Sequence, residues 1–265
     1  MLLSLDTGVT ALEQFQNQIN VIANNIANVN TVAFKEADVN FEDTMSETLG
    51  SNAAGSTQVG TGVNTSSILN DFSTQGTIAS TGQQSDLAIN GNGFFVVKDP
   101  TSGTSYVTQD GSFSVDSSGY LITSGGMRLQ GSTGDIQITA GSGSTATVKS
   151  YTIGSDGTVT ATLSDGTTNA GGQIMLQNFT NPDQLIKVGG NLYTAPTAAG
   201  GLAAAVAPGA SGTGTIESSA LEMSNVDLAG QLTALISAQR AYEANSKVIT
   251  TSDTMLQTLI NLKQG

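Results

Sequence analysis

The sequence contains neither cysteine nor histidine in its 265 residues. The absence of cysteine excludes disulfides, thiol catalysis and zinc–thiolate sites. The absence of histidine excludes an imidazole base or metal ligand, and with it any Ser/His/Asp triad. Asp and Glu are scattered through the middle of the chain, and no spacing among them singles out a catalytic pair. We therefore expect no enzyme activity, no catalytic or metal site and no cofactor.

Positive charge is also scarce, with 8 Lys and Arg against 21 Asp and Glu and a formal net charge of −13. A chain this acidic has no general attraction for nucleic acid or anionic lipid, so neither is an expected partner. The longest purely apolar runs are a few residues, against the roughly 20 that a spanning helix needs, so we expect no membrane insertion. Met1–Asp6 has neither the basic region nor the apolar region of a cleavable signal peptide.

Glycine and proline are absent from two long segments, Val9–Leu49 and Gln231–Gln264. All four Pro and nearly all of the 32 Gly lie between Gly50 and Gly230. This distribution predicts helices at both ends of the chain and a turn-rich middle.

Both glycine-poor ends have the three-and-four spacing of amphipathic helices, and Asn225 or Asp227 can cap the second helix. Each helix has more than one apolar seam, so a single helix pair leaves apolar surface uncovered. We favour packing against other copies over pairing within one monomer, and the relative direction of the helices stays open. The seam residues expected at the assembly interface are Leu5, Val9, Leu12, Ile19, Ala23, Ile26, Leu228, Leu232, Leu235, Tyr242, Ile249, Leu256, Leu259 and Ile260.

The middle of the chain has short alternating runs divided by turns such as Gly91-Asn92-Gly93, Asp110-Gly111 and Asp156-Gly157. Turn signals at roughly 8–12-residue spacing predict a barrel or sandwich. In the adjacent pair Phe94 and Phe95, alternation sends one ring inward and one outward. Three Gly/Ser/Thr-rich or Ala/Gly-rich segments are expected to be linkers or long loops: Gly50–Asn64, Gly141–Thr147 and Thr197–Thr215.

The predicted fold class is α+β, with long terminal α-helices that form a coiled-coil stalk and a central all-β domain. The predicted parts are a terminal helical domain (1–30 and 226–265), a connecting region (31–71) and a β-rich domain (72–225). Taken alone, the amphipathic ends are expected to be disordered in a monomer and to fold on assembly.

Several motifs resemble those of the bacterial flagellar axial proteins, the rod and hook family. The N-terminal one is Ile22-Ala-Asn-Asn-Ile-Ala-Asn-Val-Asn-Thr-Val-Ala-Phe-Lys35. The C-terminal ones are Leu221-Glu-Met-Ser-Asn-Val-Asp-Leu228 and Ala238-Gln-Arg-Ala-Tyr-Glu-Ala-Asn-Ser-Lys-Val-Ile-Thr250. Between them, Asp86–Val97 and Gly190–Tyr193 are similar to segments of the hook-like members.

The resemblance implies a tubular homopolymer, with terminal helices in an inner tube around a channel and β domains in the outer wall. It implies that the partners are other copies, the adjoining axial proteins of the rod and hook–filament junction, the type III export apparatus and the hook cap. It places the protein in the flagellum, outside the cytoplasm, after export without a cleaved signal peptide.

Within that family, we expect a hook subunit, with the distal rod as the alternative. The stretch between Phe72 and Leu221 has room for one β domain, which suits a distal rod or a short-form hook. The segments 221–228 and 250–263 look hook-like, and Glu47–Gly62 lacks the insertion of enteric distal rod proteins. A more remote hypothesis is a secreted β-rich module that binds a glycan or another surface.

Asn24, Asn25 and Asn28 are dense for a helix, which is typical of a frayed helix end. The alternative is that these amides form hydrogen bonds across subunits and fix the register, as a buried Asn does in coiled coils. The family resemblance favours this second interpretation.

Arg240 has two interpretations that the sequence leaves open. It either occupies a solvated position and pairs with Glu243 three residues later, or it pairs with an acidic residue of another subunit such as Glu36, Asp38 or Glu42. A partly buried pair of the second kind would specify geometry more than it would add stability.

Overall fold

The computed structural model describes residues 2–52, 55–139, 147–200 and 205–264, and it divides the chain into two compact units. Unit 1 consists of residues 1–29, 36–71 and 226–265, and unit 2 consists of residues 30–35 and 72–225. The expected connecting region 31–71 is thus shared, because residues 31–35 belong to unit 2 and residues 36–71 belong to unit 1. The predicted division into inner and outer parts of a tube stays a prediction.

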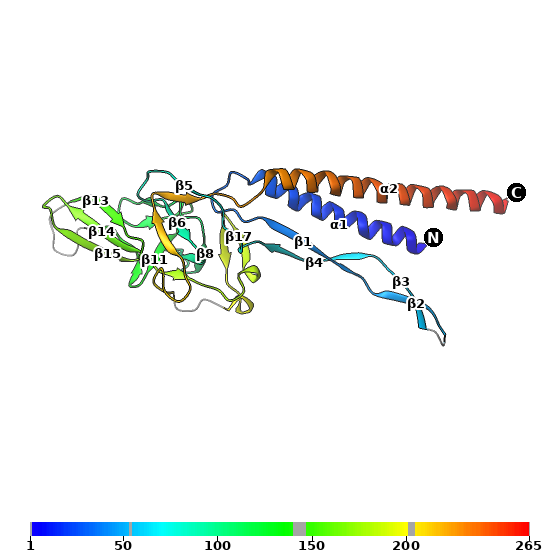
Figure 1. Cartoon of the computed structure of the whole chain (residues 1–265), viewed down its shortest axis with the longest axis horizontal. Coiled ribbons are helices and arrows are strands. Elements are labelled where there is room, and N and C mark those ends of the chain that lie inside the picture. The colour runs from blue at the N-terminus through cyan, green and yellow to red at the C-terminus, as the bar shows by residue number, and fades with distance from the viewer. Residues whose placement is uncertain (1, 53–54, 140–146, 201–204, 265) are drawn as a thin grey trace. The chain divides into compact units, whose positions relative to one another are not determined.

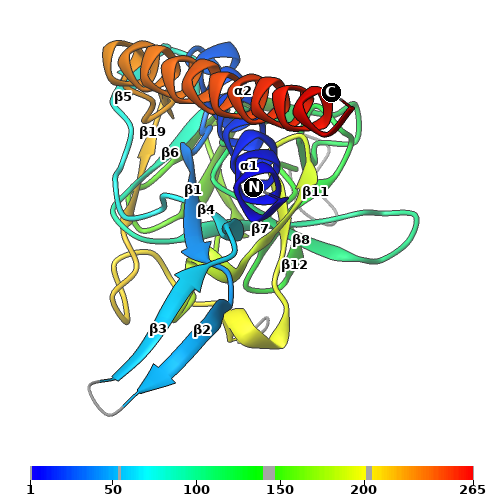
Figure 2. The same cartoon turned by 90° about the vertical axis from the view of Figure 1, so that its right-hand side faces the viewer.

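Unit 1 contains two long helices, α1 (Leu2–Ala27) and α2 (Leu228–Gln264), which run antiparallel and side by side (Figures 1 and 2). A Cβ atom at Gly8 would lie 3.2 Å from Cγ1 of Ile249. Toward the other end of the pair, Asn25 Nδ2 donates to Gln231 Oε1 at 3.2 Å. The expected terminal helices are confirmed, and their coiled-coil character stays a prediction.

The start of α2 is fixed by Asp227, one of the two residues predicted to cap it. Its carboxylate accepts hydrogen bonds from the backbone N–H of Ala229 at 3.1 Å and of Gly230 at 3.2 Å. These bonds satisfy N–H groups that have no partner inside the helix. Over their described residues, neither α1 nor α2 combines the length and apolar character that a bilayer crossing requires.

The third part of unit 1 is a pair of two-stranded ribbons, visible in Figure 2. Strand β1 (Ala37–Asp43) pairs antiparallel with β4 (Val63–Asn70), and β2 (Ser46–Asn52) pairs antiparallel with β3 (Gly55–Gly60). The ribbons are joined where Thr44 N–H donates to Gly62 O at 3.0 Å.

The expectation of a loop over Gly50–Asn64 is wrong for most of its described residues, which lie in β2, β3 and β4. Backbone N–H and C=O groups form the ladder of such a ribbon and no apolar face is required. These Gly/Ser/Thr-rich strands therefore lack the alternation of apolar and polar residues from which a strand is predicted.

Unit 2 is built around a nine-stranded sheet with the order β17-β18-β8-β7-β11-β10-β9, in which β12 also pairs with β11 and β16 with β7. Every pairing in it is antiparallel. Its ends, β17 and β9, do not pair with each other, so the sheet is open and not a closed barrel. The strands are β7 (Phe94–Lys98), β8 (Ser105–Thr108), β9 (Ser114–Val115), β10 (Leu121–Ile122), β11 (Arg128–Gly131), β12 (Gly134–Asp135), β16 (Leu176–Gln177), β17 (Ile186–Gly189) and β18 (Leu192–Thr194).

Smaller sheets complete unit 2. The predicted hairpin around Asp156-Gly157 is confirmed, with Ile153 opposite Val159. The remaining elements are β13 (Val148–Ile153), β14 (Thr158–Leu163) and β15 (Thr168–Gln173) in one sheet, β6 (Leu87–Asn90) with β19 (Thr215–Ser218), β5 (Ile78–Ser80) with β20 (Ala220–Glu222), and the 3-10 turns η1 (Pro182–Gln184) and η2 (Thr197–Ala199).

Unit 2 has two apolar clusters, and β7 contributes to both. Phe95 lies in the larger cluster with side chains of the nine-stranded sheet, the β13–β15 sheet and the β6–β19 pair. Phe94 lies in the smaller cluster, where its ring meets Phe72 and Phe179 edge to face at centroid distances of 5.3 and 5.4 Å. The two rings point to opposite faces of β7, as alternation predicts, and both are buried because both faces of β7 are covered.

The other two predicted loops lie partly outside the described residues. Only Thr147 of the segment Gly141–Thr147 is described. The described part of Thr197–Thr215 includes η2 and Val206, whose backbone exchanges two 2.8 Å hydrogen bonds with Leu176.

Gly111→Ala is expected to destabilise unit 2 strongly. A Cβ atom at Gly111 would lie 1.7 Å from the carbonyl oxygen of Leu87, so the Asp110-Gly111 turn and β6 would have to separate. The free energy of unfolding should fall by more than about 2 kcal/mol, because no flexible side chain can absorb the clash. Urea unfolding followed by tyrosine fluorescence measures it.

The control for this variant is Gly125→Ala. There the nearest heavy atom to a Cβ atom is Thr123 Oγ1, at 3.8 Å. The stability should change by no more than about 0.5 kcal/mol. Equal losses in the two variants would contradict the account of the Gly111 contact.

Candidate assembly surface

Most of the large exposed apolar side chains of the described residues lie in unit 1. Of 16 such side chains, 13 belong to unit 1 and nine of those to α2, so the uncovered apolar surface is concentrated on one helix. We call these nine the α2 surface: Leu228, Leu232, Ile236, Tyr242, Val248, Met255, Leu259, Ile260 and Leu262.

The buried stripe of α2 is made of small and polar side chains. Gln231, Ala238 and Ser252 are buried at intervals of seven residues, and Asn245 between them is half-buried. The side chains that α2 buries most deeply are thus not its large apolar ones, of which Leu235, Ile249 and Leu256 are half-buried. Small residues such as Gly8 and Ala238 allow the close approach of two helices.

At about 100° per residue, the α2 surface lies on both flanks of this buried stripe. One flank has Leu228, Leu232, Ile236, Tyr242 and Ile260, and the other has Val248, Met255, Leu259 and Leu262. The predicted wide stripe is therefore present, and α1 covers only its centre.

The predicted seam residues divide by exposure. In α2, Leu228, Leu232, Tyr242, Leu259 and Ile260 are exposed, whereas Leu235, Ile249 and Leu256 are half-buried. In α1, Val9, Ala23 and Asn24 are exposed, whereas Leu5, Leu12, Ile19, Ile26 and Asn28 are half-buried. Their role in contacts between subunits stays a prediction.

Asn25 is buried inside unit 1, and its hydrogen bonds run within its own chain. Its amide group exchanges two hydrogen bonds with the backbone of Ala37, at 2.9 and 3.1 Å, and donates to Gln231. Asn25 therefore sets the position of α1 against β1 and α2 in one subunit. At the end of α1, Asn28 Nδ2 donates to Asn24 O at 2.9 Å, and contacts of this pair across subunits stay a prediction.

Glu36 lies beside this junction. Burial raises the pKa of its carboxyl group above the ordinary value, and the nearby carboxylates of Asp38 and Asp71 act in the same direction. Hydrogen bonds from the Asp227 backbone and from the Gln231 side chain partly oppose that rise. A half-buried carboxyl group with a raised pKa thus sits where the ends of α1, β1 and α2 meet.

Arg240 is exposed on α2. The ion pairs among the described residues are Lys35–Glu222 and Arg128–Asp135, so Arg240 does not form the ion pair with Glu243 that one interpretation required. Its pairing with an acidic residue of another subunit stays a prediction.

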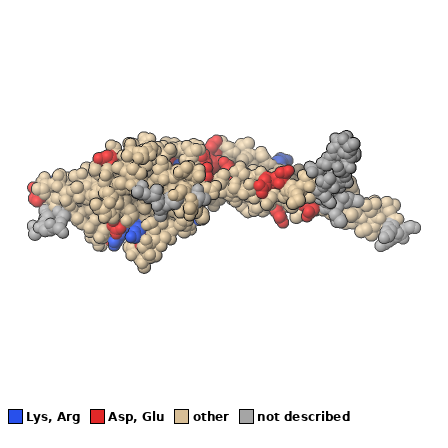
Figure 3. All heavy atoms as spheres, turned by 90° about the horizontal axis from the view of Figure 1, so that it is seen from below, with Lys and Arg blue, Asp and Glu red and all other residues tan. Residues whose placement is uncertain are grey.

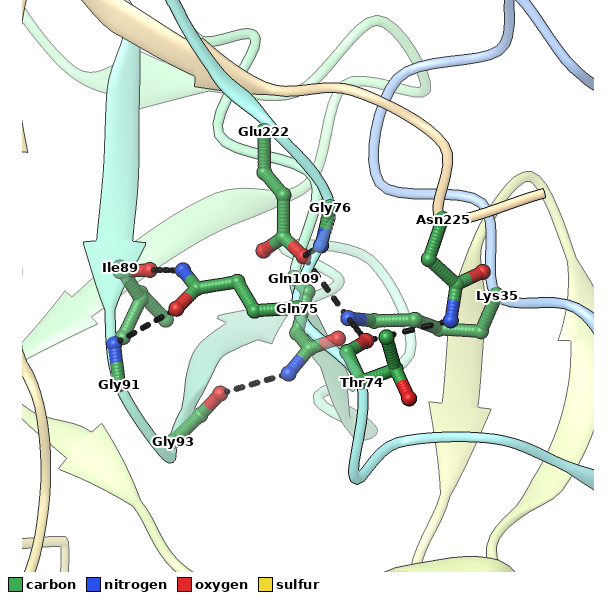
Figure 4. A network of polar contacts seen from close by, with 10 residues as sticks. All are labelled: Lys35, Thr74, Gln75, Gly76, Ile89, Gly91, Gly93, Gln109, Glu222 and Asn225. Carbon is green, nitrogen blue, oxygen red and sulfur yellow. Dashed lines mark hydrogen bonds and ion pairs between the residues drawn. The ribbon is translucent and has the colours of Figure 1, made fainter. Parts of the chain in front are cut away.

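The two terminal family motifs meet in a buried ion pair of unit 2 (Figure 4). Lys35 Nζ lies 2.8 Å from Glu222 Oε1, and the two side chains are only 2% and 3% exposed. Gly76 N–H donates to the same carboxylate oxygen at 2.9 Å, and the Lys35 ammonium donates to Thr74 O at 3.2 Å. Both charges are thus compensated inside the protein.

Hydrogen bonds to backbone carbonyl groups hold the same segments together. Ala33 N–H donates to Glu222 O at 2.8 Å, and Asn225 Nδ2 donates to Thr74 O at 3.1 Å. Nearby in Figure 4, the Gln75 and Gln109 side chains hold the Gly91–Gly93 turn through its backbone. Sequence reasoning missed the ion pair, and the available signal was a lysine and a glutamate each placed among apolar residues.

The sequence is similar along its whole length to known flagellar proteins. Models described as flagella basal body rod protein, flagellar hook protein FlgE/F/G D1 domain, and flagellar basal body rod FlgEFG protein C-terminal match residues 5–35, 88–161 and 217–262. The flagellar basal-body rod protein FlgG of Bacillus subtilis is 44% identical over 100% of both chains. That of Borreliella burgdorferi is 37% identical, also over 100% of both.

The chain is therefore a structural protein of the flagellar axis, and not an enzyme. It belongs to the family of flagellar rod and hook proteins. The flagellar hook protein FlgE of Borreliella burgdorferi is 42% identical, but over only 49% of this chain and 31% of that protein. The preference for a hook subunit is thus less well supported than its distal rod alternative.

Glu222→Gln is expected to lower the free energy of unfolding of unit 2 by about 3–5 kcal/mol, because it leaves a buried ammonium group without a counter-charge. Urea unfolding measures this loss. The double variant Lys35→Met/Glu222→Leu should recover much of the stability, since it removes both charges.

The matched control is Asp135→Asn, which makes the same change in the more exposed pair with Arg128. Its cost should stay below about 1 kcal/mol. A cost for Glu222→Gln no greater than that of this control would contradict the role given to the buried pair.

Proposed function

We propose that the chain is the distal rod subunit of the flagellar basal body, and that it polymerises into a tube through unit 1. The observation that carries this proposal is a comparison within one organism. The rod protein of Borreliella burgdorferi matches this chain from end to end, whereas its hook protein matches about half of it. A subunit with the full architecture of the rod relatives is best explained as their counterpart.

The α2 surface supports the proposed polymerisation. Burying one large apolar side chain contributes about 1.5–3 kcal/mol, and the nine exposed ones lie on two flanks of the helix. Helices of neighbouring copies on both sides would cover both flanks, which is the geometry of a tube wall and not of an isolated pair. The side chains already buried between α1 and α2 would keep their contacts.

The proposed partners follow from this assignment. Other copies extend the tube, and adjoining axial proteins continue it at its ends. Export by the type III apparatus without a cleaved signal, and a location outside the cytoplasm, belong to the same proposal. The hook cap and the hook–filament junction are partners only under the hook alternative.

A strain that lacks the gene tests the assignment. Electron microscopy of its basal bodies should show the proximal rod and nothing beyond it, and the wild-type gene should restore the missing parts. Loss of the hook with the rod intact would show a hook subunit instead. Normal flagella in this strain would show that the protein is not a required part of the axial structure.

Ile236→Ser is expected to raise the concentration at which the protein assembles by about 10- to 100-fold, because it removes the burial of an isoleucine at the contact. Sedimentation of the purified protein at increasing concentrations measures this threshold. The unfolding of unit 2 should be unchanged, since Ile236 lies in unit 1.

Thr258→Ser is the control, because Thr258 is exposed on the polar face of the same helix. It should leave the threshold within a factor of about two, as expected for an exposed residue away from the apolar flanks. Equal thresholds for Ile236→Ser and the wild-type protein would show that the α2 surface does not mediate assembly.

A further inference from the structure

The large exposed apolar side chains of unit 2 lie only on its two edge strands, among the described residues. They are Val115 on β9, and Ile186 and Val188 on β17. These strands are the two ends of the same nine-stranded sheet. On the face shown in Figure 3, most of the surface consists of uncharged residues.

Strand β17 has an open edge, because β18 is its only partner among the strands that the structure describes (Figure 1). Ile186 is 57% exposed and Val188 is 55% exposed. Lys187, between them, places its ammonium group 4.4 Å from the centre of the Phe34 ring. Soluble proteins usually protect an edge strand, so an exposed apolar one is a ready site for pairing with another strand.

Strand β9 pairs with β10 alone among the strands that the structure describes, and Ser112, two residues before it, forms a bridge with Asp86. Asp116 N–H donates to Tyr120 O at 2.9 Å, so residue 116 faces the partner strand. The N–H and C=O groups of successive residues point to opposite sides of an antiparallel strand. Those of Val115 therefore point away from β10. Val115 is 42% exposed, and Asp116 follows it directly.

We propose that β17 of one subunit pairs with β9 of a second copy, so that the two sheets become continuous. We infer a second copy as the partner because the side chains of β17 complement those at β9 in apolar character and in charge. If the strands run antiparallel, Val188 can lie opposite Val115 while Lys187 lies opposite Asp116. If they run parallel, Ile186 lies opposite Val115 and Lys187 again lies opposite Asp116. Both directions join apolar to apolar and cation to anion.

The contact uses two different edges, so it is head-to-tail and leaves one edge free at each end of a series. Such a contact gives an open array and not a closed dimer. The inference rests on the proposed function for its setting, a polymer of this chain, and it adds a specific contact between the β units.

Cysteine cross-linking tests the contact cleanly, because the natural chain has no cysteine. The double variants Val115→Cys/Val188→Cys and Val115→Cys/Ile186→Cys are assembled as full chains in the deletion strain and oxidised with copper phenanthroline. One of them should give a ladder of dimers, trimers and longer products on a non-reducing gel. The pair that reacts identifies the strand direction.

The controls are the three single variants and Val115→Cys/Thr101→Cys, whose second cysteine is on an exposed loop of unit 2. None of them should give products beyond a dimer. Motile flagella without a ladder in either test variant would overturn the edge contact and leave the proposed function standing. A ladder of equal strength from the loop control would also overturn it.

A charge exchange decides the question if the cysteine variants do not assemble. Lys187→Glu should raise the assembly threshold several-fold, and Lys187→Glu/Asp116→Lys should bring it back toward the wild-type value. The unfolding of unit 2 is measured in parallel, so that a local loss of stability is separated from a lost contact. An unchanged threshold in Lys187→Glu, or no recovery in the double variant, would overturn the inference. The deletion strain tests the proposed function independently of this contact.

Discussion

The contact between α1 and α2 buries small and polar side chains of α2 most deeply and leaves its large apolar side chains half-buried or exposed, and the rest of unit 1 depends on that arrangement. Gln231, Ala238 and Ser252 are buried, while Ile236 and Met255 remain exposed on the same helix. In an isolated monomer the usual order is the reverse, because burial of large apolar side chains is the main favourable term. The intramolecular contact thus fixes direction and register, and the apolar side chains that would add most stability stay exposed on the single subunit.

The helices, the β-rich middle and the Asp156-Gly157 hairpin could be read from the sequence, because each depends on local periodicity or turn chemistry. Contacts between distant segments could not. Lys35 and Glu222 lie 187 positions apart in the sequence, and no local sequence pattern predicts that they form an ion pair. Asn25 was singled out with Asn24 and Asn28 for contacts across subunits, whereas its hydrogen-bond partners Ala37 and Gln231 belong to its own chain.

The hook preference shows a second limit of motif reading. It relied on terminal segments such as 221–228, and the hook and rod relatives share the terminal regions of the family. Within this chain, Glu222 of segment 221–228 forms an ion pair with Lys35 inside unit 2, a contact within one subunit that does not depend on the type of polymer. The extent of the match over the whole chain favours the rod alternative, since it includes the part between the motifs.

Two kinds of contact are therefore available to a polymer of this chain, and they differ in how they respond to bending. Apolar burial along α2 is non-directional, so helices can shift slightly against each other at little cost. Pairing between strand edges is directional, because its side-chain pattern repeats every two residues and a one-residue slip reverses every side chain. A wall held by helix packing alone would tolerate sliding between subunits. A wall that also joins β17 to β9 would resist it, which is the behaviour expected of a stiff rod and not of a flexible joint.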